Sequence, residues 1–366
     1  MLLEVGPPIA NAAGVTPAPA STELPGLQHL PHGGRVLVVR LSALGDVLFA
    51  LETVAALRRE RPDAHVDFLV EDRFARLLDG HPQLDAVHIY PRRHKRRIPA
   101  SILRLRRTRY DVVLDLHGIQ KSAWHVFWTK AATKVGPGPP AAREGATFAY
   151  DITVPMPTPP PHRADIGHRL LAAIGLSGTP AAPTLATCEP PPELLAGLQR
   201  PRVLLHPGTS AFAAFKRWPR DRFAELARRL AGRGIGVVVG FGPGERELAE
   251  PALQAAPGAR AADGSQLGLA GLAGTMRHCD VVVAADTGPL HLASTVGARC
   301  VAIFGPKDER RYGPRAHGGV HHELVFHDVP CRPCRRRTCA SPQCVLGIDV
   351  DAVEAAVQHQ LAEGTP

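Results

Sequence analysis

The sequence predicts an α/β protein of two similar halves, each built on a doubly wound parallel β-sheet. Short β-branched apolar runs alternate with segments whose apolar residues recur at helical spacing, a pattern typical of βαβ units. Proline-rich stretches at 155–161 and 180–192 interrupt this alternation, which then resumes. The length of 366 residues also fits about two domains.

In the first half, strands are expected at 35–41, 65–70, 87–90 and 111–116, and helices at 46–61, within the basic segment 92–109, from about 121 and at 163–174. In the second half, strands are expected at 203–206, 236–240, 280–285 and 300–304, and helices at 219–230, 267–278, 289–296 and 350–361. We therefore expect a flexible Pro/Ala/Gly-rich extension over 1–33, domains over 34–190 and 191–347, and a C-terminal helix and tail over 348–366.

Positive charge is concentrated in one stretch. Nine Lys or Arg residues and no acid lie between Pro91 and Tyr110, in a chain whose net charge is +9. Such a patch favours an anionic partner, for example a phosphorylated lipid, a membrane surface or nucleic acid. No apolar run approaches the roughly 20 residues that cross a bilayer, and no apolar signal segment precedes Arg35, so we expect a cytoplasmic protein.

The loop 285–291 is the most informative loop of the second half, because it lies between a predicted buried strand and a helix. It carries Asp286, Thr287, Gly288 and His291. Free backbone amides and the dipole at the start of the helix favour a phosphate there, and Gly288 allows close approach to the backbone. Capping of the helix by Asp286 or Thr287 is the alternative interpretation.

Two further loops of the second half point to the same function. One contains Thr209, Ser210 and Lys216, whose compact charge suits a phosphate, and the other is a glycine-rich turn that ends at Glu245, a candidate for ribose hydroxyls. In the first half, Asp46 follows Gly45 directly after the first strand, where it is either a helix cap or a general base. A nucleotide in one half and a base in the other are typical of a two-substrate transferase.

Five motifs together resemble a known family. They occur in the order Ser42-x-x-Gly-Asp46, Asp115-x-x-Gly-x-x-Lys-Ser122, Ala142-Arg-Glu144, His206-Pro-Gly208 with Lys216-x-Trp-Pro219, and Asp286-Thr-Gly-x-x-His291. From about residue 35 to 360, the chain is similar to the ADP-heptose:lipopolysaccharide heptosyltransferases of glycosyltransferase family 9. The resemblance implies the GT-B fold, two Rossmann-like domains facing across a cleft, with the acceptor in the first and the ADP-sugar in the second.

The resemblance also implies residue roles. Asp46 becomes the general base of an inverting, metal-independent transfer from ADP-L-glycero-D-manno-heptose, and Lys216 contacts the diphosphate as charge develops on it. The donor-binding residues it implies are Thr209, Ser210, Lys216, Glu245, Asp286, Thr287, Gly288 and His291.

On the acceptor side, the resemblance implies Kdo-lipid A or its heptosylated form, part of the lipopolysaccharide inner core. The candidate acceptor residues are Ser42, Gly45, Arg92, Arg93, Lys95, Lys121 and Arg143. The enzyme is then expected at the cytoplasmic face of the inner membrane, in peripheral contact with anionic lipid. The segment 142–150 is more similar to the enzyme that adds the first heptose. The C-terminal cysteines are more similar to the enzyme that adds the second, so the sequence does not decide between the two acceptors.

Four cysteines, Cys331, Cys334, Cys339 and Cys344, lie within 14 residues. This spacing suits a structural zinc site, but free thiols or a labile disulfide are favoured because the family's chemistry requires no cofactor. Other hypotheses are a glycosyltransferase of the same fold that uses another nucleotide sugar for cell-surface glycans, a sugar-nucleotide epimerase, and a non-enzymatic basic protein that binds membranes or nucleic acid. No helix-turn-helix, RNP or zinc-finger pattern supports nucleic acid as a partner.

Overall fold

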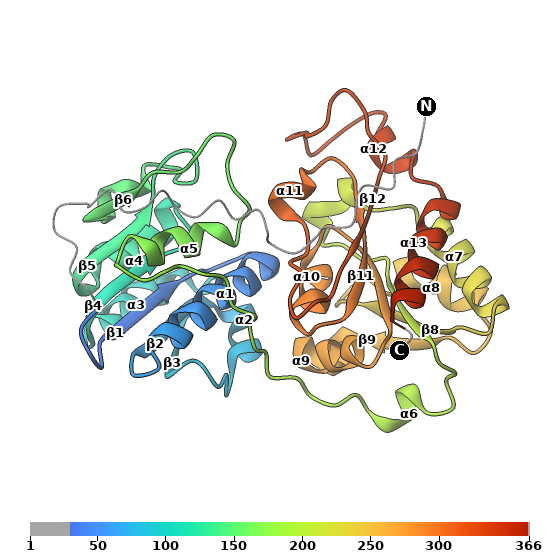
Figure 1. Cartoon of the computed structure of the whole chain (residues 1–366), viewed down its shortest axis with the longest axis horizontal. Coiled ribbons are helices and arrows are strands. Elements are labelled where there is room, and N and C mark those ends of the chain that lie inside the picture. The colour runs from blue at the N-terminus through green and yellow to red at the C-terminus, as the bar shows by residue number, and fades with distance from the viewer. Residues whose placement is uncertain (1–29, 365–366) are drawn as a thin grey trace. The chain divides into compact units, whose positions relative to one another are not determined.

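The computed structural model describes residues 30–364, which form two compact units, 30–186 and 187–364. Each unit contains one sheet with helices around it (Figure 1). Residues 1–29, most of the predicted extension, and the last two residues of the predicted tail lie outside the described part. The end of the extension is packed, because Leu30 is buried and Arg61 donates hydrogen bonds to the carbonyl oxygens of Leu30 and Pro31.

The first unit has a six-stranded parallel sheet in the order β3-β2-β1-β4-β5-β6. Its strands are β1 (Arg35–Val39), β2 (His65–Glu71), β3 (Ala86–Tyr90), β4 (Arg109–Asp115), β5 (Lys130–Pro137) and β6 (Ile152–Val154). Its helices are α1 (Leu44–Glu60), α2 (Asp72–Ala75), α3 (Ile98–Leu105), α4 (Gln120–Trp128) and α5 (Asp165–Ala172), with 3₁₀ turns η1 (Arg76–Leu78), η2 (Lys95–Arg97) and η3 (Ala146–Ala149).

The second unit repeats this architecture in the order β12-β11-β10-β7-β8-β9. Its strands are β7 (Arg202–His206), β8 (Gly236–Phe241), β9 (Arg260–Asp263), β10 (Val281–Ala285), β11 (Arg299–Phe304) and β12 (Glu323–Phe326). Its helices are α6 (Pro192–Leu195), α7 (Arg220–Gly232), α8 (Arg246–Ala255), α9 (Gly264–Arg277), α10 (Gly288–Thr295), α11 (Glu309–Tyr312), α12 (Gln343–Leu346) and α13 (Val350–Glu363), with the 3₁₀ turn η4 (Ala211–Lys216).

Burial on both faces explains why the central strands form continuous apolar runs in the sequence. Val36–Val39 of β1 and Val281–Ala284 of β10 have no exposed surface. Trp218, which precedes α7, is buried against Phe223 and donates its indole N–H to the carbonyl oxygen of Ile348 at 2.9 Å, so its role is structural. Within residues 30–364, no helix has the length and apolarity that crossing a membrane requires.

The strand order tells where each unit binds ligands. Counted within its own unit, each sheet has the order 3-2-1-4-5-6, which reverses between β1 and β4 in the first unit and between β7 and β10 in the second. Ligands of doubly wound sheets bind outside the carboxyl ends of the strands at this reversal. The predicted fold class, an α/β protein with two doubly wound parallel sheets, is confirmed.

Four strands do not follow from the sequence pattern. β6, β9 and β12 have only three or four residues and lie at sheet edges. The first half of β5 is largely solvent-accessible, so it lacks the continuous apolar run of a central strand.

Candidate active site

Asp46 lies in the first turn of α1, directly after β1 and beside the reversal of strand order. Its Oδ2 is 2.6 Å from Nη2 of Arg40, and its Oδ1 accepts a hydrogen bond from Nε of Arg163 at 3.1 Å. Of the predicted acceptor residues nearby, Ser42 is half-buried in the connection between β1 and α1, and Gly45 is buried in the first turn of α1. The carboxylate is therefore held between two guanidinium groups, one directly after β1 and one shortly before α5.

These ion pairs determine the charge of Asp46. Burial raises the pKa of its carboxyl, but the attraction of Arg40 and Arg163 outweighs this effect and holds the pKa well below its usual value. Burial lowers the pKa of Arg40 to about 10, so the guanidinium remains charged at neutral pH. Asp46 is thus ionised at neutral pH, and 24% of its side chain remains exposed and accessible to a ligand.

The neighbouring loop, between β4 and α4, is organised by Asp115. Its buried carboxylate accepts hydrogen bonds from the hydroxyl groups of Ser122 and Tyr150, both at 2.8 Å. His117 is also buried, and burial together with the charge of Arg40 lowers its pKa to about 2, so its imidazole is neutral. Among the described residues, Nδ1 of His117 has no hydrogen-bond partner. Sequence reasoning missed His117, because a single loop histidine carries no spacing signal.

A second cluster of charge surrounds Glu71, the fully buried last residue of β2. Its carboxylate pairs with Nζ of Lys121 at 2.6 Å, with Nε of Arg73 at 2.8 Å and with Nε of Arg92 at 3.7 Å. Two predicted acceptor residues, Lys121 and Arg92, are therefore brought together by an acid that sequence reasoning missed. The other predicted acceptor cations, Arg93, Lys95 and Arg143, have exposed side chains.

In the second unit, Asp286 follows β10 and is buried. Nζ of Lys216 lies 2.5 Å from its Oδ2, and Nε2 of His291 lies 3.7 Å from its Oδ1. Burial raises the pKa of Asp286, but the neighbouring imidazole of His291 and the charge of Lys216 outweigh it, and the pKa lies below its usual value. These three predicted donor residues form one group that joins η4, the end of β10 and α10.

The start of α10 is available to an anion. Thr287 occupies the N-cap position but makes no capping hydrogen bond; its hydroxyl donates to the carbonyl oxygen of Ala285 at 3.1 Å. Since the carboxylate of Asp286 is paired with Lys216, neither side chain plays the capping role considered above. The backbone amides from Gly288 onward therefore lack a side-chain cap, as a phosphate site at a helix N-terminus requires.

The remaining predicted donor residues lie on the loops after β7 and β8. Arg217 donates through Nε and Nη2 to the hydroxyl and carbonyl oxygens of Thr209, at 2.8 and 2.7 Å, while Ser210 is exposed. Oε2 of Glu245 accepts the amide of Gly242 at 3.0 Å and lies over Gly208, where a Cβ would come within 2.1 Å of it. The strands β8, β7 and β10 are neighbours, so these loops share one edge of the sheet.

Lys307, after β11, is a further cation at this edge. Its Nζ donates to the carbonyl oxygen of Cys334 at 3.2 Å and lies 5.4 Å from the ring of Phe215. Burial and the nearby charge of Lys216 lower its pKa. Sequence reasoning missed Lys307, although its position directly after a strand is a signal that could have found it.

The four clustered cysteines differ in exposure. Cys331 and Cys339 are exposed, Cys334 is half-buried and Cys344 is buried. Across residues 30–364, no three side chains of His, Cys, Asp or Glu are grouped as ligands of a metal ion.

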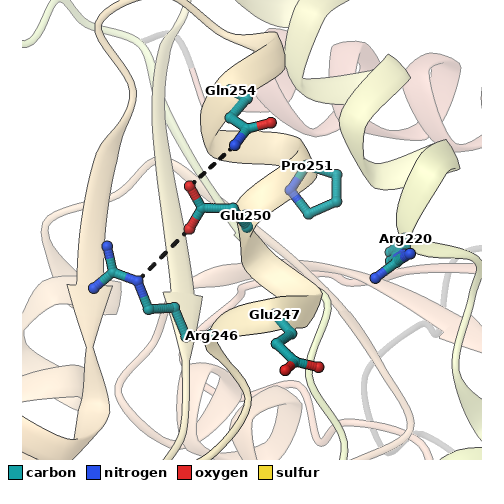
Figure 2. A pocket seen from close by; sticks show the side chains of 6 residues that line it. All are labelled: Arg220, Arg246, Glu247, Glu250, Pro251 and Gln254. Atoms are coloured by element: carbon teal, nitrogen blue, oxygen red, sulfur yellow. Dashed lines mark hydrogen bonds and ion pairs between the residues drawn. The ribbon is translucent and has the colours of Figure 1, made fainter.

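An open depression elsewhere on the second unit is shown in Figure 2. Its lining residues are Arg220, Arg246, Glu247, Glu250, Pro251 and Gln254. Glu250 is paired with Arg246 at 3.6 Å and accepts a hydrogen bond from Gln254 at 3.2 Å, so these three side chains partner one another. None of the predicted site residues lines this depression.

Comparisons with known proteins identify the family and support the fold. The family model for glycosyltransferase family 9 (heptosyltransferase) matches residues 100–345. The chain is 30% identical over 326 residues to lipopolysaccharide heptosyltransferase 1 of Pseudomonas aeruginosa, covering 83% of this chain and 87% of that protein. Among solved structures, a glycosyltransferase of family 9 from Veillonella parvula matches with a TM-score of 0.78 and 20% identity, covering 91% of this chain and 98% of that one. Escherichia coli heptosyltransferase WaaC with ADP matches with a TM-score of 0.71 and 23% identity, covering 89% and 99%. The chain belongs to glycosyltransferase family 9, the heptosyltransferase family.

Proposed function

We propose that this glycosyltransferase moves a heptose from ADP-heptose to the inner core of lipopolysaccharide. The observation that carries the proposal is that each unit has a site at its strand-order reversal: an ionised, accessible carboxylate in the first unit, and an uncapped helix start with Lys216 in the second. The name of the Pseudomonas aeruginosa relative supports lipopolysaccharide as acceptor, and ADP bound to WaaC supports the adenine nucleotide of the donor.

In the proposed mechanism, Asp46 accepts the proton of the acceptor hydroxyl as that oxygen attacks the anomeric carbon of the heptose. The bond from the anomeric carbon to ADP breaks on the opposite face, so the configuration inverts. The charge that develops on ADP is stabilised by Lys216 and by the amides at the start of α10. Glu245 accepts hydrogen bonds from the ribose hydroxyls. Every step uses side chains and amides of this chain, and no metal ion is required.

The cations around Glu71 suit the acceptor. Lys121 and Arg92 place positive charge at the carboxyl end of β2 and β3, and the exposed Arg93 and Lys95 continue it into the solvent. Kdo carboxylates and phosphates of the inner core are anions that such a group attracts. Because the lipid acceptor is membrane-bound, the proposed place of action is the cytoplasmic face of the inner membrane.

The proposal is tested by ADP release. Purified protein is incubated with ADP-heptose and with either Kdo-terminated or singly heptosylated lipid acceptor, and ADP is followed with a coupled assay. Release that depends on one acceptor supports the proposal and identifies the step. The proposal would be contradicted if no nucleotide were released from ADP-heptose with either acceptor, while another nucleotide sugar did support release.

Gly208→Ala tests the role of Glu245. The new Cβ would lie 2.1 Å from Oε2 of Glu245, and the flexible side chain is expected to swing aside. Losing hydrogen bonds to a charged group should raise the KM for ADP-heptose roughly tenfold, with a smaller change in kcat. Gly232→Ala is the matched control, because its Cβ would meet open space. An unchanged KM in Gly208→Ala would exclude Glu245 from donor binding.

A further inference from the structure

Four aromatic side chains form an exposed aromatic patch on the first unit: Trp124, Phe127 and Trp128 of α4 and Phe148 of η3. Each is between 43% and 46% exposed. Ring centroids of neighbouring members lie 5.2 to 6.1 Å apart, so the rings form one continuous surface. Half of the eight exposed large hydrophobic side chains in residues 30–364 belong to this patch. Such clustering marks an interaction surface, whereas scattered exposed residues do not.

The patch follows from the amphipathic character of α4. Positions 124, 127 and 128 lie three and four residues apart and share one face of the helix. The opposite face packs into the core through Ser122, Ala123, His125 and Val126. The aromatic face is therefore available to an external partner while the helix remains anchored.

Cations border the patch. The guanidinium of Arg106 lies 5.6 Å from the ring centroid of Trp128, and Nζ of Lys134 lies 5.8 Å from that of Phe127. Arg106 also belongs to the nine-cation stretch between Pro91 and Tyr110. Tryptophan and phenylalanine beside Lys and Arg are typical of surfaces that lie in the headgroup region of an anionic bilayer.

We propose that the aromatic patch, with Arg106 and Lys134 at its border, docks the first unit onto an anionic phospholipid bilayer. The rings insert at the level of the headgroups and the two cations contact lipid phosphates. The link to catalysis rests on the proposed function: Lys121, which pairs with Glu71, precedes Trp124 by three residues, about 4.5 Å along the helix axis. Docking through α4 would therefore hold the sugar headgroup of a membrane-embedded acceptor close to Lys121.

Tryptophan fluorescence gives a direct test. The chain has three tryptophans, of which Trp124 and Trp128 lie in the patch and Trp218 is buried in the second unit. Vesicles of phosphatidylglycerol and phosphatidylethanolamine with brominated acyl chains should quench the wild-type fluorescence. In the double variant Trp124→Phe/Trp128→Phe, the remaining signal from Trp218 should not be quenched. Quenching that persists in the double variant would overturn the proposal.

Vesicle flotation then measures affinity. Trp124→Gln/Phe127→Gln/Trp128→Gln should lower partitioning onto anionic vesicles at least tenfold, with an unchanged melting temperature. Leu346→Gln, an exposed apolar position on α12 with 40% exposure, is the matched control and should bind like wild type. Equal partitioning of the triple variant, or equal binding of wild type to purely zwitterionic vesicles, would overturn the proposal. A third result would also overturn it: wild type self-associates but does not bind vesicles, and the triple variant does not self-associate. The patch would then join two copies of the chain.

The assay separates this inference from the proposed function. With a lipid acceptor in vesicles, the triple variant should release ADP at least tenfold more slowly than wild type. With a deacylated, water-soluble acceptor, the two proteins should have equal kcat/KM. Wild type that binds vesicles but releases no ADP on either acceptor would contradict the proposed function and leave the docking surface intact. A triple variant equally impaired on the soluble acceptor would contradict the docking role.

Discussion

Replacing Asp46 with asparagine is expected to lower kcat for heptose transfer by about 10³-fold, the scale of a lost general base. The amide has nearly the shape of the carboxylate but cannot take the proton of the attacking hydroxyl. The donor residues lie in the other unit, so the Kd for ADP-heptose should change less than about threefold. Rapid-quench kinetics and calorimetric titration measure the two quantities. Near-normal turnover in Asp46→Asn would remove Asp46 from the mechanism.

The substitution also removes the negative charge that pairs with Arg40 and Arg163, so a structural cause must be separated from a chemical one. Arg163→Gln does this, because it keeps the base and removes one of the charges that lower its pKa. The pKa of Asp46 should rise, and the acid limb of the kcat/KM profile should therefore move to higher pH. At pH values well above this acid limb, activity should be largely retained. A profile that only falls uniformly, without moving along the pH axis, would mean that Arg163 supports the fold and not the protonation state of Asp46.

The two acids that could be predicted, Asp46 and Asp286, share a simple property: each follows a predicted strand. Asp46 after β1 and Asp286 after β10 are found because an apolar run ends, a polar residue appears, and a helix begins. The parallel α/β class then predicts that such loops gather at the carboxyl edge of the sheet. The structure places both residues beside the reversal of strand order, while their chemical roles stay predictions.

Lys216 and His291, which pair with Asp286, were already candidates. The partners of Asp46 and Lys121 could not be predicted, because they depend on strand order. Glu71 meets Lys121 across 50 residues, and Asp46 meets Arg163 across 117. Nothing local to Glu71 distinguishes a buried acid at the end of β2 from an exposed one, and only the adjacent packing of β2, β1 and β4 decides it. The short edge strands are missed for a related reason. Pairing with a neighbouring strand holds them in the sheet more than their own composition does.

Lys216→Met is expected to lower kcat by about 10²-fold to 10³-fold, because it removes the cation that stabilises the departing diphosphate. It should also destabilise the fold by up to about 3 kcal/mol, since the side chain of buried Asp286 then keeps, within residues 30–364, only His291 as a charged partner. Lys216 helps to lower the pKa of Asp286 below its unfolded value of about 3.9. The ion pair therefore stabilises the folded state above that pH, and this stabilisation is lost as the pH falls through the folded-state pKa. The difference between the two proteins in free energy of unfolding should therefore be largest at neutral pH and shrink below about pH 4.

A double variant separates the two losses. In Lys216→Met/Asp286→Asn the buried negative charge disappears together with its cation, so the free energy of unfolding at pH 7 should recover most of the loss seen in Lys216→Met. Transfer should not recover, because the diphosphate still lacks the ammonium group. Urea unfolding of the second-unit fluorophore Trp218, in a protein with Trp124 and Trp128 replaced by Phe, follows the stability of that unit alone. If activity returned together with stability, Lys216 would be a structural counter-ion of Asp286 and the diphosphate would have to be held by other groups, of which Lys307 is the nearest candidate by charge.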